Sequence, residues 1–375
     1  MLLFDYNFRR YNIRMVLYMV ALSVIGILAI WSATNQSESA VKKQIMGIAI
    51  GLFLAAVLSL IDYHKLLSMS TMIYLACVVM LVAVLLMGTS RGIATRWIVL
   101  PVIGQIQPAE FVKIGLIMFF SWYFGKYEER KNQPSVLGIG ALLFAVPALL
   151  IFKQPNLSTT LVVTVIIASV VFASGVSYKW VLGVLAVVIP ATGLIIYLLR
   201  YDMIPFIEQY QANRILAWID PEQYAEAYYQ QENSIMAIGS GRLWGKGLSN
   251  TEIASVKNGN FLIEEQTDFI FAIVGEEMGF VGALVVMGLL LVIVIECLIM
   301  ASRARDLSGR LICVGMATLF GFQSFANIAV ATAIFPNTGL PLPLISSGVS
   351  SLLSIYIGMG VVLNVGLQRK TREDY

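Results

Sequence analysis

Charged residues are scarce in this chain of 375 residues. Asp, Glu, Lys and Arg make up 13% of it, about half of the share that an average soluble domain carries. Hydrophobic residues make up 58% and the mean hydropathy is +0.82, so the excess apolar surface needs lipid as its partner. We therefore predict an integral membrane protein. The net charge of +3 is small and spread over loops, so we expect no nucleic-acid partner.

Histidine and cysteine are also rare. His64 is the single histidine, and it lies in a short predicted loop. If the protein is an enzyme, this nearly excludes a histidine general base and a histidine metal site. Cys77, Cys297 and Cys313 all fall in apolar segments without metal-ligand spacing, so we expect packed or lipid-facing side chains there.

Long apolar runs dominate what is present. About 20 apolar residues are needed for a helix to cross a bilayer core. By that rule the sequence predicts an all-α, polytopic membrane protein with about ten transmembrane helices. The predicted spans lie near 14–34, 42–61, 69–88, 107–125, 137–152, 157–174, 179–199, 267–300, 310–334 and 345–367. The first run has no cleavage site of small residues, which favours a helix over a cleaved signal peptide.

The distribution of Lys and Arg predicts the orientation. An even number of spans places both termini on one side. The short loops on the opposite side hold few basic residues, namely Lys42, Lys43, Arg91, Arg96 and Lys153. Both termini are therefore predicted to be cytoplasmic, with one long extracellular loop at about 200–266. We expect residues 1–375 to form a single transmembrane domain that includes this loop.

The segment 335–350 reads FPNTGLPLPLISSGVS and is rich in Pro, Gly and Ser without any charge. Its unpaired backbone groups would be too costly in bare lipid, so it must pack on protein or line a wet cavity. No internal repeat is visible, so the inverted-repeat signature of many transporters is missing from the sequence.

Carboxylates stand at the mouth of the apolar run that follows the long loop. Glu264 and Glu265 precede Asp268 by four and three residues, so all three are expected on one helix face. Asp268 is expected about one turn inside the helix, and ionisable residues inside a membrane are functional by default. Glu264 and Glu265 also fit solvated first-turn acids. Glu276 and Glu277 lie deeper and cannot share a face.

Basic residues accompany these acids in the outward segments. Glu110 and Lys113 are three residues apart on a predicted helix, either as a structural ion pair or as part of an anion pocket. Arg96 is either a solvated loop charge or a phosphate ligand, and Trp97 fits an interface anchor. Together, Arg91, Arg96, Lys113 and Lys153 put several positive charges near the outer membrane surface. This suits a ligand that carries phosphate at the level of the lipid headgroups, although snorkelling near helix ends explains single cases.

The segment GSGRLWGKG at 239–247 superficially resembles a nucleotide-binding loop. Ser240 stands where the first glycine of that motif is needed, and Gly247 stands where Ser or Thr is needed. We reject a nucleotide site and expect the glycines to allow tight turns.

Six motifs, in this order and spacing, resemble the SEDS family, the RodA and FtsW proteins of bacterial wall synthesis. They are RW ending at 97, IQPAEFVK ending at 113, KQPNLSTT ending at 160, NSIMAIGSGRLWGKG ending at 247, EEQTDFIFAIVGEEMGFVG ending at 282 and PNTGLPLPLISSGVSSLL ending at 353. The resemblance runs from the first span to the last. The GKG ending and the loop ARDLSGR at 304–310 are more similar to RodA than to FtsW.

The resemblance implies a ten-helix peptidoglycan polymerase in the bacterial cell membrane that serves cell shape or division. Its substrate would be lipid II, as donor and acceptor, and its partners a class B penicillin-binding protein and other wall-synthesis machinery. The catalytic aspartate of the family's TDF motif matches Asp268. The family's Q-P-S-E-F-x-K matches Glu110 and Lys113, with Ala109 in place of Ser.

The chain departs from the family pattern at four further positions. Asn156 and Ser158 replace Asp and Gly of Q-P-D-L-G-T, Arg242 replaces a Gly of G-S-G-G, and Val349 replaces a Gly of G-G-S-S. If the acid replaced by Asn156 tunes a lysine or a metal in relatives, that role is weakened or relocated here. None of these departures touches Asp268.

The resulting hypothesis is that Asp268 acts as general base on the 4-hydroxyl of the acceptor sugar. Arg96, Lys113 and either Lys153 or a divalent metal, Mg²⁺ or Mn²⁺, would hold the donor pyrophosphate. No cofactor is established by the sequence. A single displacement would form a β-1,4 linkage with inversion. The predicted substrate-binding residues are Arg96, Trp97, Gln107, Glu110, Lys113, Lys153, Gln154, Asn156, Glu265, Thr267, Ser347 and Ser350.

Two other classes of function remain open at this point. A lipid II flippase would use buried charges and a wet midline equally well. A non-catalytic scaffold for a class B penicillin-binding protein would tolerate replacement of Asp268 while depending on its outer loops.

Overall fold

The protein is described by a computed structural model that covers residues 8–91, 94–100, 104–201, 203, 207–249, 259, 261–262 and 265–368. Helices account for most of these residues. They are α1 (Ile13–Ala33), α2 (Glu38–Leu60), α3 (Tyr63–Ser68), α4 (Ser70–Met87), α5 (Pro108–Lys126), α6 (Pro134–Phe152), α7 (Leu157–Ala173), α8 (Tyr178–Arg200), α9 (Gln209–Ile219), α10 (Ala225–Ser240), α11 (Ile270–Ser302), α12 (Leu307–Ala331) and α13 (Val349–Leu367), with the short 3₁₀ helices η2 (Phe8–Arg10) and η3 (Glu128–Arg130).

The helical, membrane-spanning architecture predicted from the apolar runs is confirmed, because each predicted span coincides with one of these helices. Eight helices in the described part of the chain are long and apolar enough to cross a membrane. The apolar helix α7 is shorter, and α5 carries Glu110 and Lys113 in its first two turns. The number of ten spans and the single domain over 1–375 stay predictions.

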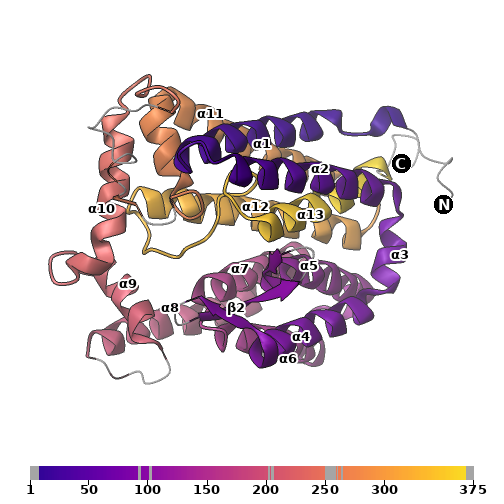
Figure 1. Cartoon of the computed structure of the whole chain (residues 1–375). Helices are drawn as coiled ribbons and strands as arrows, with labels where there is room; N and C mark the ends of the chain where they lie inside the picture. The colour runs from indigo at the N-terminus through magenta and orange to yellow at the C-terminus, as the bar shows by residue number, and fades with distance from the viewer. Residues whose placement is uncertain are drawn as a thin grey trace.

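The helices form two packed halves (Figure 1). One half contains α1, α2, α11, α12 and α13, and the other contains α4 to α7. Helix α12 joins the halves because it packs on α5 and α7 as well as on α11 and α13. Helix α13 lies so close to α2 that a Cβ atom on Gly360 would come within 2.8 Å of the Ala55 backbone. Small residues permit such close helix packing in membranes.

Burial separates central helices from lipid-facing ones. The apolar side chains of α5, α12 and α13 are mostly buried in one hydrophobic core. Within α8, which the structure describes completely, Leu199 alone is buried, so this helix presents its apolar side chains to the surroundings. In a bilayer these surroundings are lipid, which explains why an apolar helix can remain exposed.

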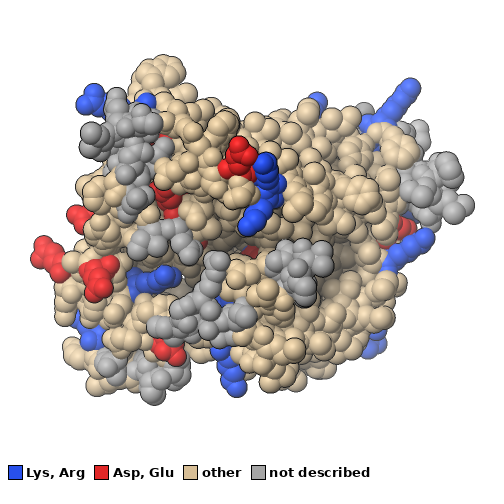
Figure 2. Space-filling view, in the orientation of Figure 1, with Lys and Arg blue, Asp and Glu red and all other residues tan. Residues whose placement is uncertain are grey.

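The two ends of the bundle differ in composition. The start of α1 and the end of α13 lie together at one end, which we name the cytoplasmic end (Figure 1). Helices α9 and α10 lie across the opposite, outer end. In Figure 2 tan, uncharged residues make up most of the visible face, acidic residues gather over α9 and α10, and Lys and Arg are visible at both ends.

Short strands interrupt the helical pattern between α4 and α5. β1 (Thr89–Arg91), β2 (Ala94–Leu100) and β3 (Gly104–Ile106) form an antiparallel sheet in the order β1-β2-β3. Thr95 pairs with Ser90, and Ile98 pairs with Ile106. The sequence reading placed this stretch in an outward segment but did not predict the sheet. Its role here is to hold Arg96 and Trp97 on one strand beside the start of α5.

Helix α11 contains a break, and the glycine-rich loop 239–247 packs against it. Gly279 has a φ of 67° inside the helix. Lys246 N and Gly247 N donate to the carbonyl oxygens of Glu276 and Glu277 at 2.9 and 3.0 Å. A Cβ atom on Gly245, whose φ is 79°, would lie 2.1 Å from the Glu277 carbonyl oxygen. The prediction that these glycines serve tight backbone geometry is confirmed, and no α-helical hydrogen-bond pattern can continue through this point.

Candidate active site

The segment that leads into α11 is shaped by contacts with other parts of the chain. The carbonyl oxygen of Gln266 accepts from Ser347 N at 2.8 Å, and that of Thr267 accepts from Ser346 Oγ at 2.6 Å. The carbonyl oxygen of Asp268 accepts from Asn327 Nδ2 at 2.8 Å. Because these carbonyls bond outside the helix, α11 begins only at Ile270. The expectation that Asp268 lies one turn inside the helix is therefore wrong, since it lies in the turn before it.

The carboxylate of Asp268 faces the uncharged loop that precedes α13. A Cβ atom built on Gly339 would lie 3.0 Å from Asp268 Oδ2 and 3.7 Å from Arg214 Nη1. The carboxylate and the guanidinium thus flank the same glycine, although their residues are far apart in sequence. Gly339 has a φ of 64°, a conformation that favours glycine. Because this position has no side chain, the carboxylate and the guanidinium can both lie close to the loop backbone.

Two polar side chains one turn apart on α12 hold this loop in place. Asn327 Nδ2 donates to the Leu340 carbonyl oxygen at 2.7 Å as well as to that of Asp268. Gln323 Nε2 donates to the Pro341 carbonyl oxygen at 2.9 Å. Leu342 N donates to Ser346 Oγ at 2.8 Å, which closes the turn within the loop. Of the two alternatives expected for the uncharged segment, packing on protein and lining a wet cavity, these contacts show packing on protein.

Glu110 and Lys113 form the predicted ion pair at the start of α5. Lys113 Nζ lies 2.8 Å from Glu110 Oε1 and donates to Gln323 Oε1 at 2.9 Å. Both charged groups are buried, and Lys113 is 0% exposed. Burial of a lone charge would be costly, so Glu110 Oε1 and the amide oxygen of Gln323 offset the burial of the Lys113 ammonium. Through Gln323, the pair is connected to the loop that flanks Asp268.

Arg96 is not a solvated loop charge, because its guanidinium is bound by backbone. Nε donates to the Gln154 carbonyl oxygen at 3.3 Å, and Nη2 donates to the Pro155 carbonyl oxygen and to Tyr210 Oη, the latter at 3.1 Å. Burial lowers the pKa of Arg96; nearby Tyr210 opposes this shift, nearby Arg214 adds to it, and Asp268 opposes it. The site therefore holds two arginines, a tyrosine and an aspartate in one electrostatic group.

The connection between α6 and α7 lies against the same loop. Asn156 caps α7, because its Oδ1 accepts from Thr159 N at 3.2 Å. Ser158 Oγ donates to the Thr338 carbonyl oxygen, next to Gly339. Gln154 is buried and donates to the Leu81 carbonyl oxygen at 3.0 Å, whereas Lys153 is exposed. Asn156 thus performs the capping that an aspartate would perform, without its charge.

The remaining predicted residues occupy supporting positions. Ser350 is buried, and its Oγ accepts from Gln107 N at 3.1 Å, which connects α13 to the start of α5. Glu265 is also buried, and Trp97 is partly buried. Glu264, which the sequence grouped with Asp268, lies outside the described residues.

Several buried polar atoms around the site have no hydrogen-bond partner within the part of the chain that the structure describes. They are Glu110 Oε2, Gln154 Oε1, Asn156 Nδ2, Asn327 Oδ1, Asn337 Oδ1 and Thr338 Oγ1. Native proteins rarely leave such groups unsatisfied, and those that persist call for a ligand or water. Their concentration on the segments that meet near Asp268 indicates a region built to bind a polar ligand.

The described residues contain no preformed set of ligands for the divalent metal that the sequence left open. Within residues 8–91, 94–100, 104–201, 203, 207–249, 259, 261–262 and 265–368, no group of three or more His, Cys, Asp or Glu side chains could hold a metal ion. A divalent ion here would need substrate phosphates to complete its coordination, as Mg²⁺ commonly does.

Sequence reasoning missed the partners that come from distant segments. Arg214 and Tyr210 lie on α9 within the long loop, and Gln323 and Asn327 lie on α12. The sequence could have indicated the two α12 residues, because polar amides four residues apart in an apolar run lie on one helix face. Arg214 carried no comparable signal, since its position beside Gly339 depends on how the long loop folds back.

Comparisons with known proteins identify the family. A family model described as a cell cycle protein, FtsW/RodA/SpoVE, matches residues 11–371. The peptidoglycan glycosyltransferase MrdB of Escherichia coli strain K12 is 33% identical over 361 residues, which cover 95% of this chain and 93% of MrdB. FtsW of Trichlorobacter lovleyi, named as a probable peptidoglycan glycosyltransferase, is 31% identical over 96% of this chain and 94% of its own length.

Solved structures show the same fold. A chain from a study on the structural coordination of polymerization and crosslinking by a peptidoglycan synthase complex superposes with a TM-score of 0.79 at 28% identity, covering 96% of this chain and 98% of the other. The rod shape determining protein RodA of Thermus thermophilus gives a TM-score of 0.69 at 26% identity, with 98% of both chains covered.

Proposed function

Because this chain belongs to the FtsW/RodA/SpoVE family of cell cycle proteins, we propose that it is a peptidoglycan glycosyltransferase that polymerises lipid II at the outer face of the cell membrane. The resemblance predicted from its motifs is confirmed, and the protein is a multi-pass cell membrane protein. The fold of a peptidoglycan synthase complex member supports a crosslinking partner, which we propose is a class B penicillin-binding protein.

Asp268 is the proposed general base. Glycosyl transfer requires removal of the proton from the acceptor 4-hydroxyl as its oxygen attacks the anomeric carbon of the donor. Asp268 is partly exposed at the outer end, and its carboxylate lies beside Gly339, as does Arg214. The only histidine, His64, belongs to the cytoplasmic end and contacts Asp62 and Asp306. This arrangement leaves the aspartate as the base best placed for the acceptor.

The proposed reaction is a single displacement. The acceptor oxygen forms a bond to the donor anomeric carbon, and the bond from that carbon to the pyrophosphate oxygen breaks. The acceptor proton passes to Asp268, and undecaprenyl pyrophosphate leaves with the bonding electron pair. One carboxylate that acts as base, without a covalent intermediate, inverts an α-linked donor to a β-1,4 product.

Cations must stabilise the charge that develops on the leaving pyrophosphate. Arg96 and Arg214 are the cations closest to Asp268 in the described electrostatic group, and we assign them this task. Lys113 contacts the pyrophosphate only if Glu110 and Gln323 release it. We therefore propose that Lys113 mainly positions the loop around Gly339. No step of this reaction is routed through a metal.

The observation that carries the proposal is the placement of the Asp268 carboxylate and Arg214 beside the same glycine, with unsatisfied buried polar atoms on the surrounding segments. The test supplies labelled lipid II to the purified chain, with and without a class B penicillin-binding protein, for wild type and Asp268→Asn. Glycan polymer from the wild-type chain, together with no polymer from a folded Asp268→Asn variant, supports the proposal. Lipid II movement between leaflets without polymer would favour a flippase, and polymer from both chains would remove Asp268 as the base.

A further inference from the structure

A cavity lies at the cytoplasmic end, away from the site around Asp268. It has a volume of about 360 Å³ and is lined by the start of α1, the end of α11 and the end of α13. This volume is in the range of small-molecule sites and is far larger than a single ion needs. Nothing in the polymerisation mechanism uses this cavity.

Four arginines line the cavity together with a single carboxylate. Arg9, Arg10 and Arg14 come from the N-terminal segment and α1, and Arg303 comes from the end of α11. Glu296 is the carboxylate, and its Oε2 accepts from Asn12 Nδ2 at 2.7 Å. The lining therefore carries a clear excess of positive charge from segments that are distant in sequence.

The first turn of α1 adds to this preference for an anion. Asn12 caps the helix, because its Oδ1 accepts from Met15 N at 3.2 Å. The backbone N–H groups at the start of a helix and the helix dipole both favour negative charge. Arginine forks also suit phosphate oxygens better than a lysine ammonium does.

The apolar part of the lining indicates which kind of anion binds. Ile13 is 62% exposed and Ile299 is 36% exposed, and both line the cavity beside the arginines. Ile13 begins α1 and Ile299 lies near the end of α11, two helices that are long and apolar enough to cross a membrane. The ends of such helices are expected near the level at which bilayer headgroups meet acyl chains. Inorganic phosphate has no apolar group that could contact these side chains, whereas the acyl chains of a phospholipid can pack on them.

We propose that this cavity, lined by Arg9, Arg10, Arg14 and Arg303, binds the headgroup of an anionic phospholipid of the cytoplasmic leaflet. Basic pockets between membrane helices on the cytoplasmic side bind such headgroups in other proteins. The lipid bridges the start of α1 and the end of α11. The site is independent of the proposed glycosyl transfer.

The test measures lipid binding to the detergent-purified full chain by native mass spectrometry. Phosphatidylglycerol is the probe, and phosphatidylcholine and inorganic phosphate are the comparison ligands. We expect Arg14→Gln/Arg303→Gln to weaken phosphatidylglycerol binding by about tenfold or more, because it removes two of the four arginines that attract the headgroup. The matched control is Arg305→Gln/Arg310→Gln, which removes two exposed arginines outside the cavity at the same end and should bind like wild type.

A gain-of-binding variant guards against misfolding of the double variant. Glu296→Gln removes the opposing charge while keeping an acceptor for Asn12, so it should bind phosphatidylglycerol more tightly than wild type. Equal binding of phosphatidylglycerol and phosphatidylcholine by wild type would overturn the proposal. An equal loss in the control double variant, or full competition by inorganic phosphate, would overturn it as well.

Discussion

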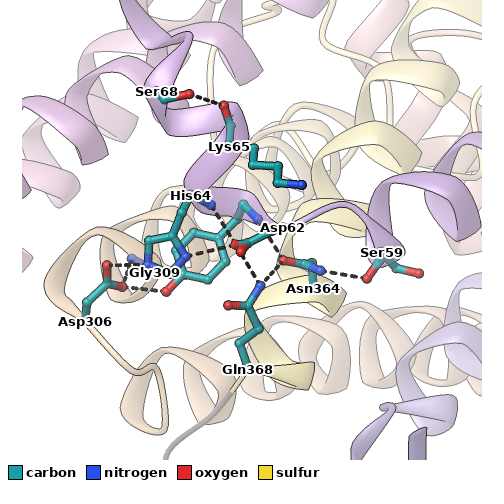
Figure 3. Close-up of polar contacts among 10 residues, drawn as sticks. Ser59, Asp62, His64, Lys65, Ser68, Asp306, Gly309, Asn364 and Gln368 are labelled. Carbon is teal, nitrogen blue, oxygen red and sulfur yellow. Dashed lines mark hydrogen bonds and ion pairs between the residues drawn. The ribbon is translucent and has the colours of Figure 1, made fainter. Parts of the chain in front are cut away.

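The two ends of the molecule treat buried polar groups in opposite ways. At the cytoplasmic end, polar side chains from α2, α3, α12 and α13 bond to one another, as Figure 3 shows. Tyr63 Oη donates to Asp306 Oδ1 at 2.7 Å, and Asn364 Oδ1 accepts from Tyr63 N at 2.9 Å. Gln368 Nε2 donates to Asp62 at 2.9 Å, and His64 lies between Asp62 and Asp306.

At the outer end, in contrast, several buried hydrogen-bond donors and acceptors have no partner among the described residues. Asn156 Nδ2, Asn337 Oδ1 and Thr338 Oγ1 are buried without partners among the described residues. Among the described residues, none of the network residues Asp62, Tyr63, Asp306, Asn364 and Gln368 has such an atom, although Ser70 Oγ at the start of α4 is also buried without a partner. The comparison teaches that closed polar networks stabilise the bundle, whereas incomplete ones mark where substrate is handled.

Removal of the buried lysine of the outer end should have the largest effect on stability. Lys113→Met leaves the Glu110 carboxylate buried without its cation, which should cost about 3–5 kcal/mol of unfolding free energy. Unfolding in detergent, followed by circular dichroism, measures this. The double variant Glu110→Gln/Lys113→Met should recover much of the loss, and an equally unstable double variant would show that the pair is not what stabilises this region.

Neutralising the arginine beside Asp268 should mainly reduce catalysis. Arg214→Gln removes a positive charge next to Gly339, and loss of one such stabilising group typically costs about 10²–10³ in kcat. The rate of glycan formation from lipid II measures this effect. Arg200→Gln, which removes an exposed arginine at the end of α8, is the control and should retain the wild-type rate. Equal rates for both variants would place Arg214 outside the reaction.

A methyl group at Gly339, beside the acid, should separate activity from stability. Gly339→Ala places a Cβ 3.0 Å from Asp268 Oδ2 at a φ of 64°. The left-handed conformation costs about 1–2 kcal/mol for an L residue. We expect a tenfold or larger fall in kcat with only this modest loss of stability. Gly183→Ala in α8, where the added Cβ meets no atom of another described segment within 4 Å, is the control. It should leave kcat unchanged and should not lower stability, because alanine is the better helix former.

A change in the closed network should affect stability without affecting chemistry. Tyr63→Phe removes the hydroxyl that donates to Asp306, while Gly309 N continues to donate to the same oxygen. We expect a loss of about 1 kcal/mol of unfolding free energy and an unchanged rate per folded molecule. A large loss of polymerisation at unchanged stability would contradict the assignment of stability to the cytoplasmic network and of catalysis to the outer end.

The smallest expected effect concerns pH at the cytoplasmic end. Burial raises the pKa of Asp62, but hydrogen bonds from Gln368 and His64 outweigh it, so the net shift lies below the ordinary value of 3.8. A lowered pKa means that the ionised form stabilises the fold above 3.8 and that this contribution is lost as pH falls through the folded-state pKa. Asp62→Asn should therefore lower Tm at pH 7, and the difference from wild type should narrow in acid. A difference that widened in acid would contradict the assigned sign.

Local sequence patterns predicted what depends on local physics. Apolar runs located the spans, and the spacing of Glu110 and Lys113 predicted their ion pair. The composition of 335–350 predicted that it packs on protein or lines a wet cavity, and its bonds to α12 show packing on protein.

The rest depends on contacts between distant segments. The start of α11 at Ile270 is decided by bonds from Ser346, Ser347 and Asn327 to the preceding carbonyls. The neighbourhood of Arg214 and Asp268 likewise arises from the folding of the long loop. Neither contact follows from the periodicity of a single segment. The start of α11 and the proximity of Arg214 to Asp268 could therefore not be predicted from the sequence.

The most direct measurement compares the same substitution at the two ends. Asp268→Asn and Asp62→Asn are purified with a class B penicillin-binding protein, and initial rates of glycan formation from labelled lipid II are measured per folded molecule. The account predicts a loss of about 10²-fold or more for Asp268→Asn, as expected for removal of a general base, and a nearly wild-type rate for Asp62→Asn. A wild-type rate for Asp268→Asn, or an equal loss at Asp62, would contradict it.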